Sequence, residues 1–369
     1  MPDVIDLSDR DEQAVARAVT SAAQCLRDGH LVVIPEEAGY HLLADASSDA
    51  ACQVLLNGAE FMPVVWGLEA DGLLADVSDA SGPGALTRRL SRRCWPGPVV
   101  LDVTTTGDIP AAWSQLLVDR TGADQAVRLG VPLHEISRAL LNLMDSPLLA
   151  TPLPVSPSGQ LELEACTPAT LILQAGPTRY QGGDTTIRVR GDEWEITREG
   201  VVGPGIVARL ASQVIIFVCT GNTCRSPMAE ALFRKLLTQR LQCPDEELVE
   251  RGFLVGSAGV AAYGGSPISP EAADSLRERG IDSSSHVSQP VTAELAQQAD
   301  LLVTMTQAHR DALLATWPDA ATRVRLLDPD GHDVADPIGG SAAVYAACCQ
   351  QIENHLEQLA EDWLDLPST

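Results

Sequence analysis

The amino-acid sequence predicts two α/β domains that meet near residue 205. The first observation is the length, because 369 residues exceed the roughly 250 at which a single hydrophobic core stops growing. The second is a cluster of glycine and proline at residues 200–205, which is typical of a domain boundary. The third is the alternation of strand and helix patterns after this cluster, which predicts a doubly wound α/β/α domain with a parallel sheet. We expect domains at 1–205 and 213–369, with a linker at 206–212.

The first of these domains carries few clear patterns. Residues 15–26 place apolar side chains on one face of a helix. Residues 31–34 form a short apolar strand pattern that ends at Pro35, and residues 171–173 predict another strand. Residues 51–107 show no periodicity that fits a helix or a strand. We therefore expect irregular structure in that segment.

The second domain begins with the apolar run at residues 214–218, which is typical of a strand buried on both faces of a parallel sheet. Ser226 and Pro227 then predict the start of a helix, because proline suits the first helical position. Further helices are expected at 270–280, 307–314 and 342–364, and further strands at 301–305 and 324–327.

The composition is that of a globular protein without affinity for nucleic acid or membranes. A net charge of -25 predicts repulsion from both, and no apolar run reaches the roughly 18 residues that a membrane span needs. Residues 1–10 are acidic and do not resemble a secretory signal, and the nine cysteines lack the spacing of a disulfide framework. We expect a cytoplasmic protein with free thiols and without a metal or cofactor.

A phosphate-binding loop is predicted directly after the apolar run, where a cysteine, five residues and then Arg-Ser lead into the helix. Backbone N–H groups of such a loop surround an oxyanion, and the helix amino terminus adds positive charge. Arg225 can donate two hydrogen bonds to phosphate oxygens, and the same positive field favours the thiolate form of Cys219. Cys219 is therefore the expected nucleophile. Its alternative interpretation is a buried thiol of the core.

The remaining residues of this loop have expected supporting roles. Gly221 permits close approach of the backbone to the phosphate, and Asn222 tolerates a left-handed conformation. Ser226 is expected to donate a hydrogen bond to the thiolate. The full set expected to bind phosphate, besides Cys219 and Arg225, is Thr220, Gly221, Asn222, Thr223, Cys224 and Ser226.

Residues 215–230, with the sequence IIFVCTGNTCRSPMAE, resemble the active-site segment of low-molecular-weight protein-tyrosine phosphatases. The resemblance extends to the segment DPIGGS at 336–341 and so covers nearly the entire second domain. It implies a phosphoric monoester hydrolase that acts on a phosphorylated protein through a phosphocysteine on Cys219. It also implies that Asp336 is the general acid.

Two residues keep an alternative role. Asp336 could instead be an ordinary turn residue, as expected for Asp328. However, of these two Asp-Pro pairs only the one at Asp336 is followed by Ile-Gly-Gly-Ser. The resemblance implies that Cys224 forms a reversible disulfide with Cys219 and protects it from further oxidation. A packing role for Cys224 is the alternative.

The expected substrate depends on two positions. Thr223 stands where tyrosine-specific relatives often have a bulkier aliphatic residue, and the loop resembles that of bacterial protein-arginine phosphatases. Ile338 stands where tyrosine-specific relatives commonly place an aromatic residue, which phosphotyrosine would stack on. Both positions favour phosphoarginine over phosphotyrosine. An arsenate reductase is less favoured, because no cysteine lies between Cys243 and Cys348 to relay oxidation.

Residues 15–202 resemble the threonylcarbamoyl-AMP synthase (YrdC-like) family, which implies an open α/β domain with a twisted mixed sheet and a nucleotide cavity. The resemblance rests on short segments, which are 32–36 with Tyr40, 95–98, 126–128, 174–177, 184–187 and 196–198 with Gly200.

The residues that bind nucleotide in that family are replaced here. Residues 57–60, Asn-Gly-Ala-Glu, stand in place of Lys-x-Arg-Pro, residues 35–38, Pro-Glu-Glu-Ala, replace Pro-Thr-Glu-Thr, and residues 152–154 replace the Ser-Ala-Asn loop. Lys235 is the only lysine of the chain, so no lysine in the first domain substitutes. We expect a domain that has lost synthase activity. There are three alternatives. The domain could retain anion binding by Arg128, Arg179 and Arg198, it could be a tRNA-modification enzyme to which the phosphatase is an accessory, or it could be a targeting module.

Overall fold

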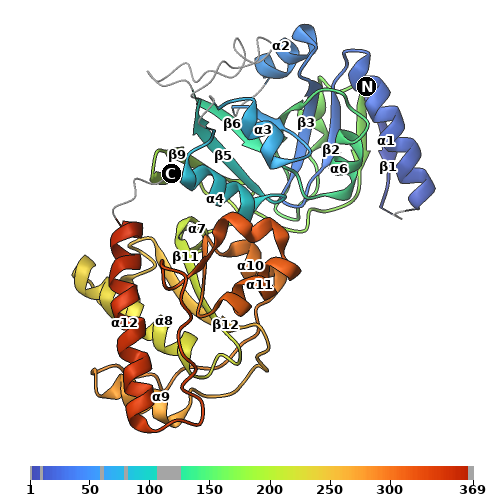
Figure 1. Cartoon of the computed structure of the whole chain (residues 1–369). Helices are drawn as coiled ribbons and strands as arrows, with labels where there is room; N and C mark the ends of the chain where they lie inside the picture. Colours follow the sequence, from blue (N-terminus) through green and yellow to red (C-terminus); the bar gives the residue numbers. More distant parts are fainter. Residues whose placement is uncertain (1, 9–10, 59–61, 79–81, 106–125, 365–369) are drawn as a thin grey trace. The chain divides into compact units, whose positions relative to one another are not determined.

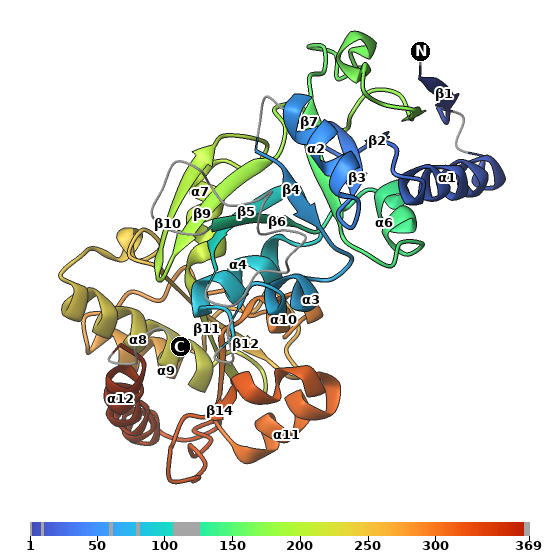
Figure 2. The same ribbon diagram turned by 90° about the horizontal axis from the view of Figure 1, so that it is seen from above.

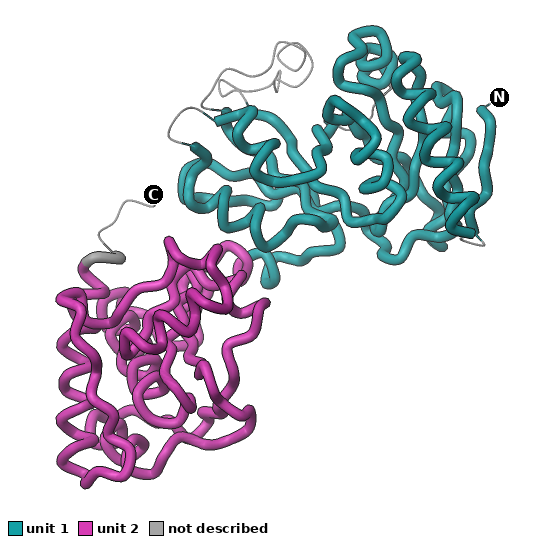
Figure 3. Tube along the Cα trace, turned by 45° about the vertical axis from the view of Figure 1, so that its right-hand side comes forward, with its two compact units in different colours: residues 1–207, 368 teal, residues 208–367, 369 magenta. Residues whose placement is uncertain are grey.

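The computed structural model describes residues 2–8, 11–58, 62–78, 82–105 and 126–364 (Figure 1). The chain divides into two compact units between Val207 and Ala208 (Figure 3). Residues 206–212, which were expected to form a linker, lie largely in helix α7 (Pro204–Ala211). No helix in the described part of the chain is both long enough and apolar enough to cross a membrane.

The first unit is built on a mixed sheet, in agreement with the expected fold class. In order across the sheet, the described strands are β1 (Asp3–Asp6), β8 (Leu171–Gln174), β2 (Val32–Pro35), β3 (Tyr40–Asp45), β7 (Leu148–Leu153), β4 (Val64–Trp66), β6 (Ala126–Gly130), β5 (Val99–Thr104), β9 (Thr185–Arg190) and β10 (Glu193–Arg198). Parallel and antiparallel pairs are both present: β2 is antiparallel to β3 but parallel to β8.

Helix α1 (Glu12–Arg27) covers one face of this sheet. Asp11 caps the helix, because its side chain accepts a hydrogen bond from the Ala14 N–H at 3.1 Å. The buried side chains of α1, from Ala18 to Leu26, recur at helical spacing and pack with Val32 and Ile34 of β2. Helix α6 (Glu135–Leu141) contributes to the same apolar cluster beside α1 (Figure 2).

The expectation of irregular structure at 51–107 is wrong. The segment contains most of helix α2 (Asp49–Gly58), and also α3 (Ala70–Ala75), α4 (Ala85–Cys94), β4 and β5. Helix α4 buries Leu86, Leu90 and Cys94 at intervals of four residues. Four arginines between these positions give the helix a strongly polar sequence, and α3 and β4 are too short for a periodicity to be recognised.

The second unit is a parallel four-stranded sheet covered on both faces. The strand order is β12 (Phe253–Gly259), β11 (Gln213–Cys219), β13 (Leu301–Thr304) and β14 (Val324–Leu326). Ile215 and Phe217 of β11 belong to one apolar cluster, whereas Val214, Ile216 and Val218 belong to another. The apolar run is therefore buried on both faces, as the sequence predicts.

Different helices complete these two clusters. Helices α8 (Arg225–Leu241), α9 (Pro270–Arg277) and α12 (Ala342–Leu364) lie on the face of Ile215 (Figure 1). Helices α10 (Ala293–Gln298) and α11 (Gln307–Thr316) lie on the face of Val214. Short 3-10 helices occur at Leu163–Cys166, Asp245–Glu247 and Pro318–Arg323.

Strand β12 and helix α10 were not predicted from the sequence. The second half of β12 reads Gly-Ser-Ala-Gly, which has low strand propensity. The small residues serve a close approach, because a Cβ on Gly259 would stand 2.4 Å from the Thr220 carbonyl oxygen and 3.0 Å from the Asn222 nitrogen. The small residues that let β12 approach the loop also lower its strand propensity. This is why the strand was not predicted from the sequence.

Candidate active site

The predicted phosphate loop lies at the carboxyl end of β11, between that strand and α8. Cys219 is the last residue of the strand and is 3% exposed. The backbone of the loop is tied to the segment after β12, since the N–H groups of Val260 and Ala261 donate to the carbonyl oxygens of Cys219 and Thr220 at 2.9 and 3.0 Å. Ligands of parallel α/β sheets bind at this edge.

Asn222 fixes the shape of the loop from inside. Its φ of 55° lies in the left-handed region, as expected for asparagine. Its side-chain Nδ2 donates to Ser226 Oγ at 3.0 Å and to Ser257 Oγ at 2.8 Å. Its Oδ1 accepts from the Gln289 N–H at 2.9 Å. Because the side chain is fully buried, these bonds hold the loop without competition from water.

Ser226 places a hydroxyl against the expected nucleophile. Its Oγ lies 3.0 Å from Cys219 Sγ and 3.3 Å from the Ala258 carbonyl oxygen. Asn222 already donates to this oxygen, so the single hydroxyl hydrogen of Ser226 is directed either to the Ala258 carbonyl oxygen or to the sulfur. A thiolate at Cys219 would accept that hydrogen bond.

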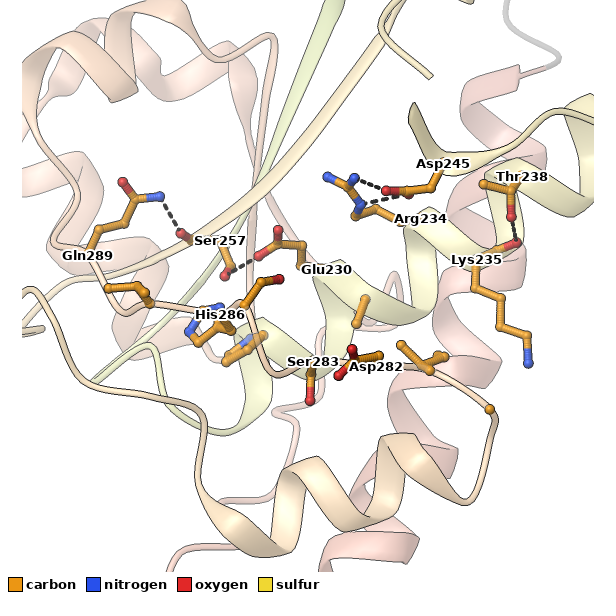
Figure 4. Close-up of a pocket in the computed structure, with 16 residues that line it drawn as sticks. Glu230, Arg234, Lys235, Thr238, Asp245, Ser257, Asp282, Ser283, His286 and Gln289 are labelled. Carbon is orange, nitrogen blue, oxygen red and sulfur yellow. Dashed lines mark hydrogen bonds and ion pairs between the residues drawn. The ribbon is translucent and has the colours of Figure 1, made fainter. Parts of the chain in front are cut away.

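Behind the loop lies a cavity of about 650 Å³ with a polar wall (Figure 4). Ser257 donates from its Oγ to Glu230 Oε2 at 2.6 Å, and His286 Nε2 lies 2.8 Å from the Asn222 carbonyl oxygen. Burial raises the pKa of Glu230, although the hydrogen bond from Ser257 opposes this shift. Ser257 and His286 both line this cavity and contact Asn222, so its wall supports the loop.

Arg225 and Asp336 are brought together although 111 positions separate them in the chain. Arg225 is 5% exposed and donates from Nη2 to Asp336 Oδ2 at 2.6 Å. Its Nη1 donates to the Val334 carbonyl oxygen at 3.2 Å. The Asp336 side chain is 45% exposed, so it pairs with the arginine while facing solvent.

His309 contacts the loop, although no sequence pattern predicted a role for it. Its Nε2 lies 2.9 Å from Thr220 Oγ1 in the loop, and its Nδ1 lies 2.9 Å from Thr306 Oγ1. Burial and then the nearby Arg225 lower the pKa of His309 to about 4, so the ring is neutral at pH 7. The signal in the sequence was Thr306, whose side chain caps α11 three residues before the histidine.

The other expected site residues lie around the loop. Thr223 is half-buried, and its carbonyl oxygen accepts from the Ser269 N–H at 2.8 Å. Gly221 is uncrowded, since a Cβ there would meet only Thr223 Oγ1 at 3.7 Å. Ile338 is 72% exposed, and its N–H donates to Asp336 Oδ1 at 3.3 Å.

Cys224 is a buried free thiol beside polar groups. Its Sγ lies 3.3 Å from Ser269 Oγ and 3.6 Å from the Tyr345 hydroxyl. Cys348, on α12, contacts the Ala335 carbonyl oxygen at 3.5 Å, one residue before Asp336. Burial raises the pKa of Cys348 to about 12, which keeps it an unreactive thiol.

Asp328 and Asp336 have different surroundings. Asp328 accepts from the Asp330 N–H at 2.8 Å and lies 3.1 Å from His332 Nδ1, as a turn residue does. The ligand atoms of Asp328, Asp330 and His332 lie within 4.8 Å of one another, close enough for a metal ion. The hydrogen bonds of the turn account for this cluster.

Of the three arginines expected to bind an anion in the first unit, one lines a described cavity. Arg179 lines a cavity of about 280 Å³ with Glu36, Glu37 and Tyr40, whereas Arg128 and Arg198 do not line it. Arg128 Nε lies 3.8 Å from Asp102 Oδ2 on the neighbouring strand. Residues 59–60 of the replaced Lys-x-Arg-Pro segment lie outside the described residues.

Both units are similar to known families. A family model described as "Low molecular weight phosphotyrosine protein phosphatase" matches residues 214–365. The Sua5_yciO_yrdC model, described as "Telomere recombination", matches residues 24–200.

Three individual proteins illustrate the similarity of the second unit. A protein-arginine-phosphatase of Bacillus subtilis is 40% identical over 154 residues, which cover 40% of this chain and 94% of that protein. A probable low molecular weight protein-tyrosine-phosphatase, EpsP, of Ralstonia nicotianae is 32% identical over 146 residues, covering 39% and 92%. An arsenate reductase of Brevibacillus brevis is 34% identical over 142 residues, covering 36% and 94%.

Proposed function

The chain belongs to the low molecular weight phosphotyrosine protein phosphatase family, and from this we propose that Cys219 removes phosphate from a phosphorylated protein side chain through a phosphocysteine intermediate. The chain is accordingly a phosphoric monoester hydrolase joined to a Sua5/YrdC-type domain. The observation that carries the proposal is the 3.0 Å contact between Cys219 Sγ and Ser226 Oγ, in a loop whose Arg225 is paired with Asp336.

In the first step, the Cys219 thiolate attacks phosphorus while the backbone N–H groups of the loop and Arg225 bind the phosphate oxygens. The S–P bond forms as the bond from phosphorus to the leaving oxygen or nitrogen breaks. The electron pair goes to the leaving atom, which takes a proton from Asp336. Because Asp336 pairs with Arg225 Nη2 when no substrate is bound, the phosphate replaces its carboxylate there. This exchange frees Asp336 to carry a proton.

In the second step, water attacks phosphorus and the S–P bond breaks. The electron pair returns to the Cys219 sulfur, and the Asp336 carboxylate takes a proton from the water. The Ser226 hydroxyl stabilises the thiolate as it leaves, because its oxygen lies 3.0 Å from the sulfur. Inorganic phosphate then dissociates.

Phosphoarginine is the substrate that the site residues favour. Thr223 is a small polar residue on the loop, and the exposed residue beside Asp336 is Ile338, which offers no aromatic ring for phosphotyrosine. The similarity to the Bacillus subtilis protein-arginine-phosphatase supports the same substrate, while the similarity to EpsP leaves phosphotyrosine as the alternative. Arsenate reduction is less favoured, because Cys348 is buried and protonated.

The test is hydrolysis of matched phosphoarginine and phosphotyrosine peptides by wild-type protein and by two variants. Cys219→Ser should abolish turnover of both peptides while the thermal unfolding profile stays that of wild type. Thr223→Ile should lower the ratio of kcat/KM for phosphoarginine to that for phosphotyrosine by about tenfold, the effect of roughly 1.4 kcal/mol. Full activity in Cys219→Ser would exclude the nucleophile, and an unchanged ratio in Thr223→Ile would exclude the specificity role.

We further propose that the first unit lacks threonylcarbamoyl-AMP synthase activity. The cavity beside the replaced Pro-Thr-Glu-Thr segment contains Glu36 and Glu37, and Arg179, the one arginine among its described lining residues, is already paired with Glu37 at 3.8 Å. A triphosphate would meet carboxylates where it needs cations.

A further inference from the structure

His309 joins the phosphate loop to the carboxyl end of β13. Its Nε2 atom lies 2.9 Å from Thr220 Oγ1 in the loop, and its Nδ1 atom lies 2.9 Å from Thr306 Oγ1, just beyond the strand. Thr306 Oγ1 also accepts from the His309 backbone N–H at 3.3 Å, as the cap of α11. The neighbouring Met305 N–H donates to the Val218 carbonyl oxygen of β11 at 3.0 Å. The ring is therefore held at both nitrogen atoms by segments that are bonded to each other.

The His309 ring is neutral and offers one donor and one acceptor. The residue is 6% exposed, and burial together with the nearby Arg225 lowers its pKa to about 4. Asp333 and Asp336 oppose this shift, but the ring stays uncharged at pH 7. A neutral imidazole carries a hydrogen on one nitrogen and accepts a hydrogen bond on the other. The chain of two hydroxyl groups and the ring between them can therefore run in one of two directions.

The exposure of the two threonines favours one direction. In the first, the Thr306 hydroxyl donates to Nδ1 and the Nε2–H group donates to Thr220 Oγ1. The hydroxyl hydrogen without an acceptor then belongs to Thr220, an exposed residue, where water or a ligand can accept it. In the second, that hydrogen belongs to Thr306, which is half-buried and whose hydroxyl has no other acceptor among the described residues. A donor left without an acceptor away from water is costly, so the first direction is favoured.

The Thr220 hydroxyl lies on the side of the loop where the reaction is proposed to occur. Its carbonyl oxygen turns to the segment after β12, where the Ala261 N–H donates to it at 3.0 Å, while its side chain reaches His309 on α11. Arg225 and Asp336 are both close enough to His309 to shift its pKa. These are the two residues to which we assign phosphate binding and proton transfer. The free hydroxyl hydrogen is thus available to a phosphate oxygen.

We propose that the Thr220 hydroxyl donates a hydrogen bond to the phosphate group of the bound substrate and that His309 is the positioning residue that directs this hydroxyl. The loop then offers a side-chain donor in addition to its backbone N–H groups and Arg225. The ring must be neutral for this role, because a protonated ring could not accept from Thr306. The inference deepens the phosphatase function proposed above and rests on it.

The binding test is calorimetric titration of the full chain with inorganic phosphate at pH 7. Thr220→Val removes the hydroxyl at nearly constant size and should weaken phosphate binding about tenfold, the loss of one hydrogen bond to a charged group. His309→Leu should weaken binding to a similar extent. The double variant should bind about as Thr220→Val does, because both changes remove the same donor. Thr220→Ser, which keeps the hydroxyl, should bind within about threefold of wild type.

Thr316→Val is the matched control. It removes a threonine hydroxyl from the exposed surface of the same helix, where the group donates to the Ala312 carbonyl oxygen at 3.0 Å. Phosphate binding should stay within about twofold of wild type. An equal loss in Thr316→Val and His309→Leu would show that damage to α11 explains the effect, and would overturn the positioning role.

The direction of the hydrogen bonds is tested in wild-type protein with isotopically labelled histidine, by nuclear magnetic resonance. The nitrogen shifts of the His309 ring should place its hydrogen on Nε2 at pH 7. A hydrogen on Nδ1, or a protonated ring at pH 7, would overturn the proposal. This measurement needs no variant, so it decides the matter if His309→Leu does not fold.

The outcomes separate this inference from the proposed function. If wild-type protein hydrolyses phosphopeptides but Thr220→Val binds phosphate equally well, the phosphatase function stands and the hydroxyl donor is refuted. If Cys219→Ser remains active while Thr220→Val still binds phosphate more weakly, the nucleophile is refuted and the donor stands. A lower kcat/KM of Thr220→Val for a phosphopeptide, with unchanged binding of inorganic phosphate, would place the hydroxyl on the leaving group and refute the proposal.

Discussion

At the scale of single residues, the site depends on side chains that hold other side chains. The buried side-chain amide of Asn222 makes three hydrogen bonds. One of them is donated to Ser226 Oγ, and this same oxygen contacts Cys219 Sγ. Arg225 is held in the same way by Asp336 and the Val334 carbonyl oxygen. The groups expected to bind and transfer phosphate are therefore positioned before substrate arrives, which lowers the reorganisation needed for reaction.

Replacement of Asp336 by asparagine tests the proposed general acid. Asp336→Asn keeps the size of the side chain but removes its proton and its charge. We expect kcat for a phosphopeptide with a poor leaving group to fall about 10² to 10⁴-fold. For an aryl phosphate with a good leaving group, whose departure needs no proton, the fall should be much smaller.

The control for this prediction is Asp328→Asn, which alters the other Asp-Pro pair of the second unit. Its carboxylate bonds within a turn and does not contact Arg225 in the described structure, so kcat should change less than threefold. Equal losses for good and poor leaving groups in Asp336→Asn would show that the residue acts through Arg225 and transfers no proton.

Most of the loop residues were identifiable from the sequence because their spacing is set by backbone geometry over eight positions. His309 was not identified as a site residue, since it lies 89 positions from Thr220 and reaches it only when α11 packs against the sheet. Ser257 on β12 and Gln289, which bond to the Asn222 side chain, were not identified for the same reason. Contacts across the sheet follow from tertiary packing, which a local pattern does not contain.

At the scale of elements, the glycine at the end of β12 allows the backbone of this strand to lie close to the phosphate loop. The backbone of Gly259 stands against Thr220 and Asn222, where no side chain fits. The sequence predicted β11 because five apolar residues form an unambiguous pattern, but glycine and serine concealed β12. The elements that the sequence predicted well are thus those buried by large apolar side chains. The short or polar ones, such as α3, α4 and β4, were missed.

Gly259→Ala should distort the loop and lower both stability and activity. The new Cβ would lie 2.4 Å from the Thr220 carbonyl oxygen and 2.8 Å from the Ala262 Cβ, so backbone must move. We expect a loss of about 1–3 kcal/mol in the free energy of unfolding, measured with urea, and at least a tenfold fall in kcat/KM.

Gly256→Ala on the same strand is the matched control. Its Cβ would meet only the Ile216 Cδ1 atom at 3.2 Å, and the tip of that side chain can shift. Activity should stay within about threefold of wild type. If the two alanine variants lose the same activity, close approach at Gly259 does not explain the glycine.

At the scale of the whole molecule, two units with different chemistry occupy one chain. The proposed phosphate loop of the second unit carries Arg225, whereas Glu36 and Glu37 line the cavity of the first unit. The fold class of each was predictable, because the resemblances rest on segments spread along both halves.

The full chain should form no threonylcarbamoyl-AMP. Incubation with ATP, threonine, bicarbonate and magnesium should release no pyrophosphate above the rate without threonine, because the cavity carries the wrong charge for a triphosphate. A competent synthase of the same family serves as the positive control. Release that depends on threonine would refute the loss of synthase activity.

The lysine content of helix α8 has a practical consequence. Lys235 is the only lysine of the chain, and its Nζ donates to the Arg279 carbonyl oxygen at 2.7 Å. A protease that cleaves after lysine has a single target bond, which lies inside this hydrogen-bonded helix. Cleavage requires the helix to open, so the rate at which the intact band disappears on a gel reports the local opening of the phosphatase unit alone.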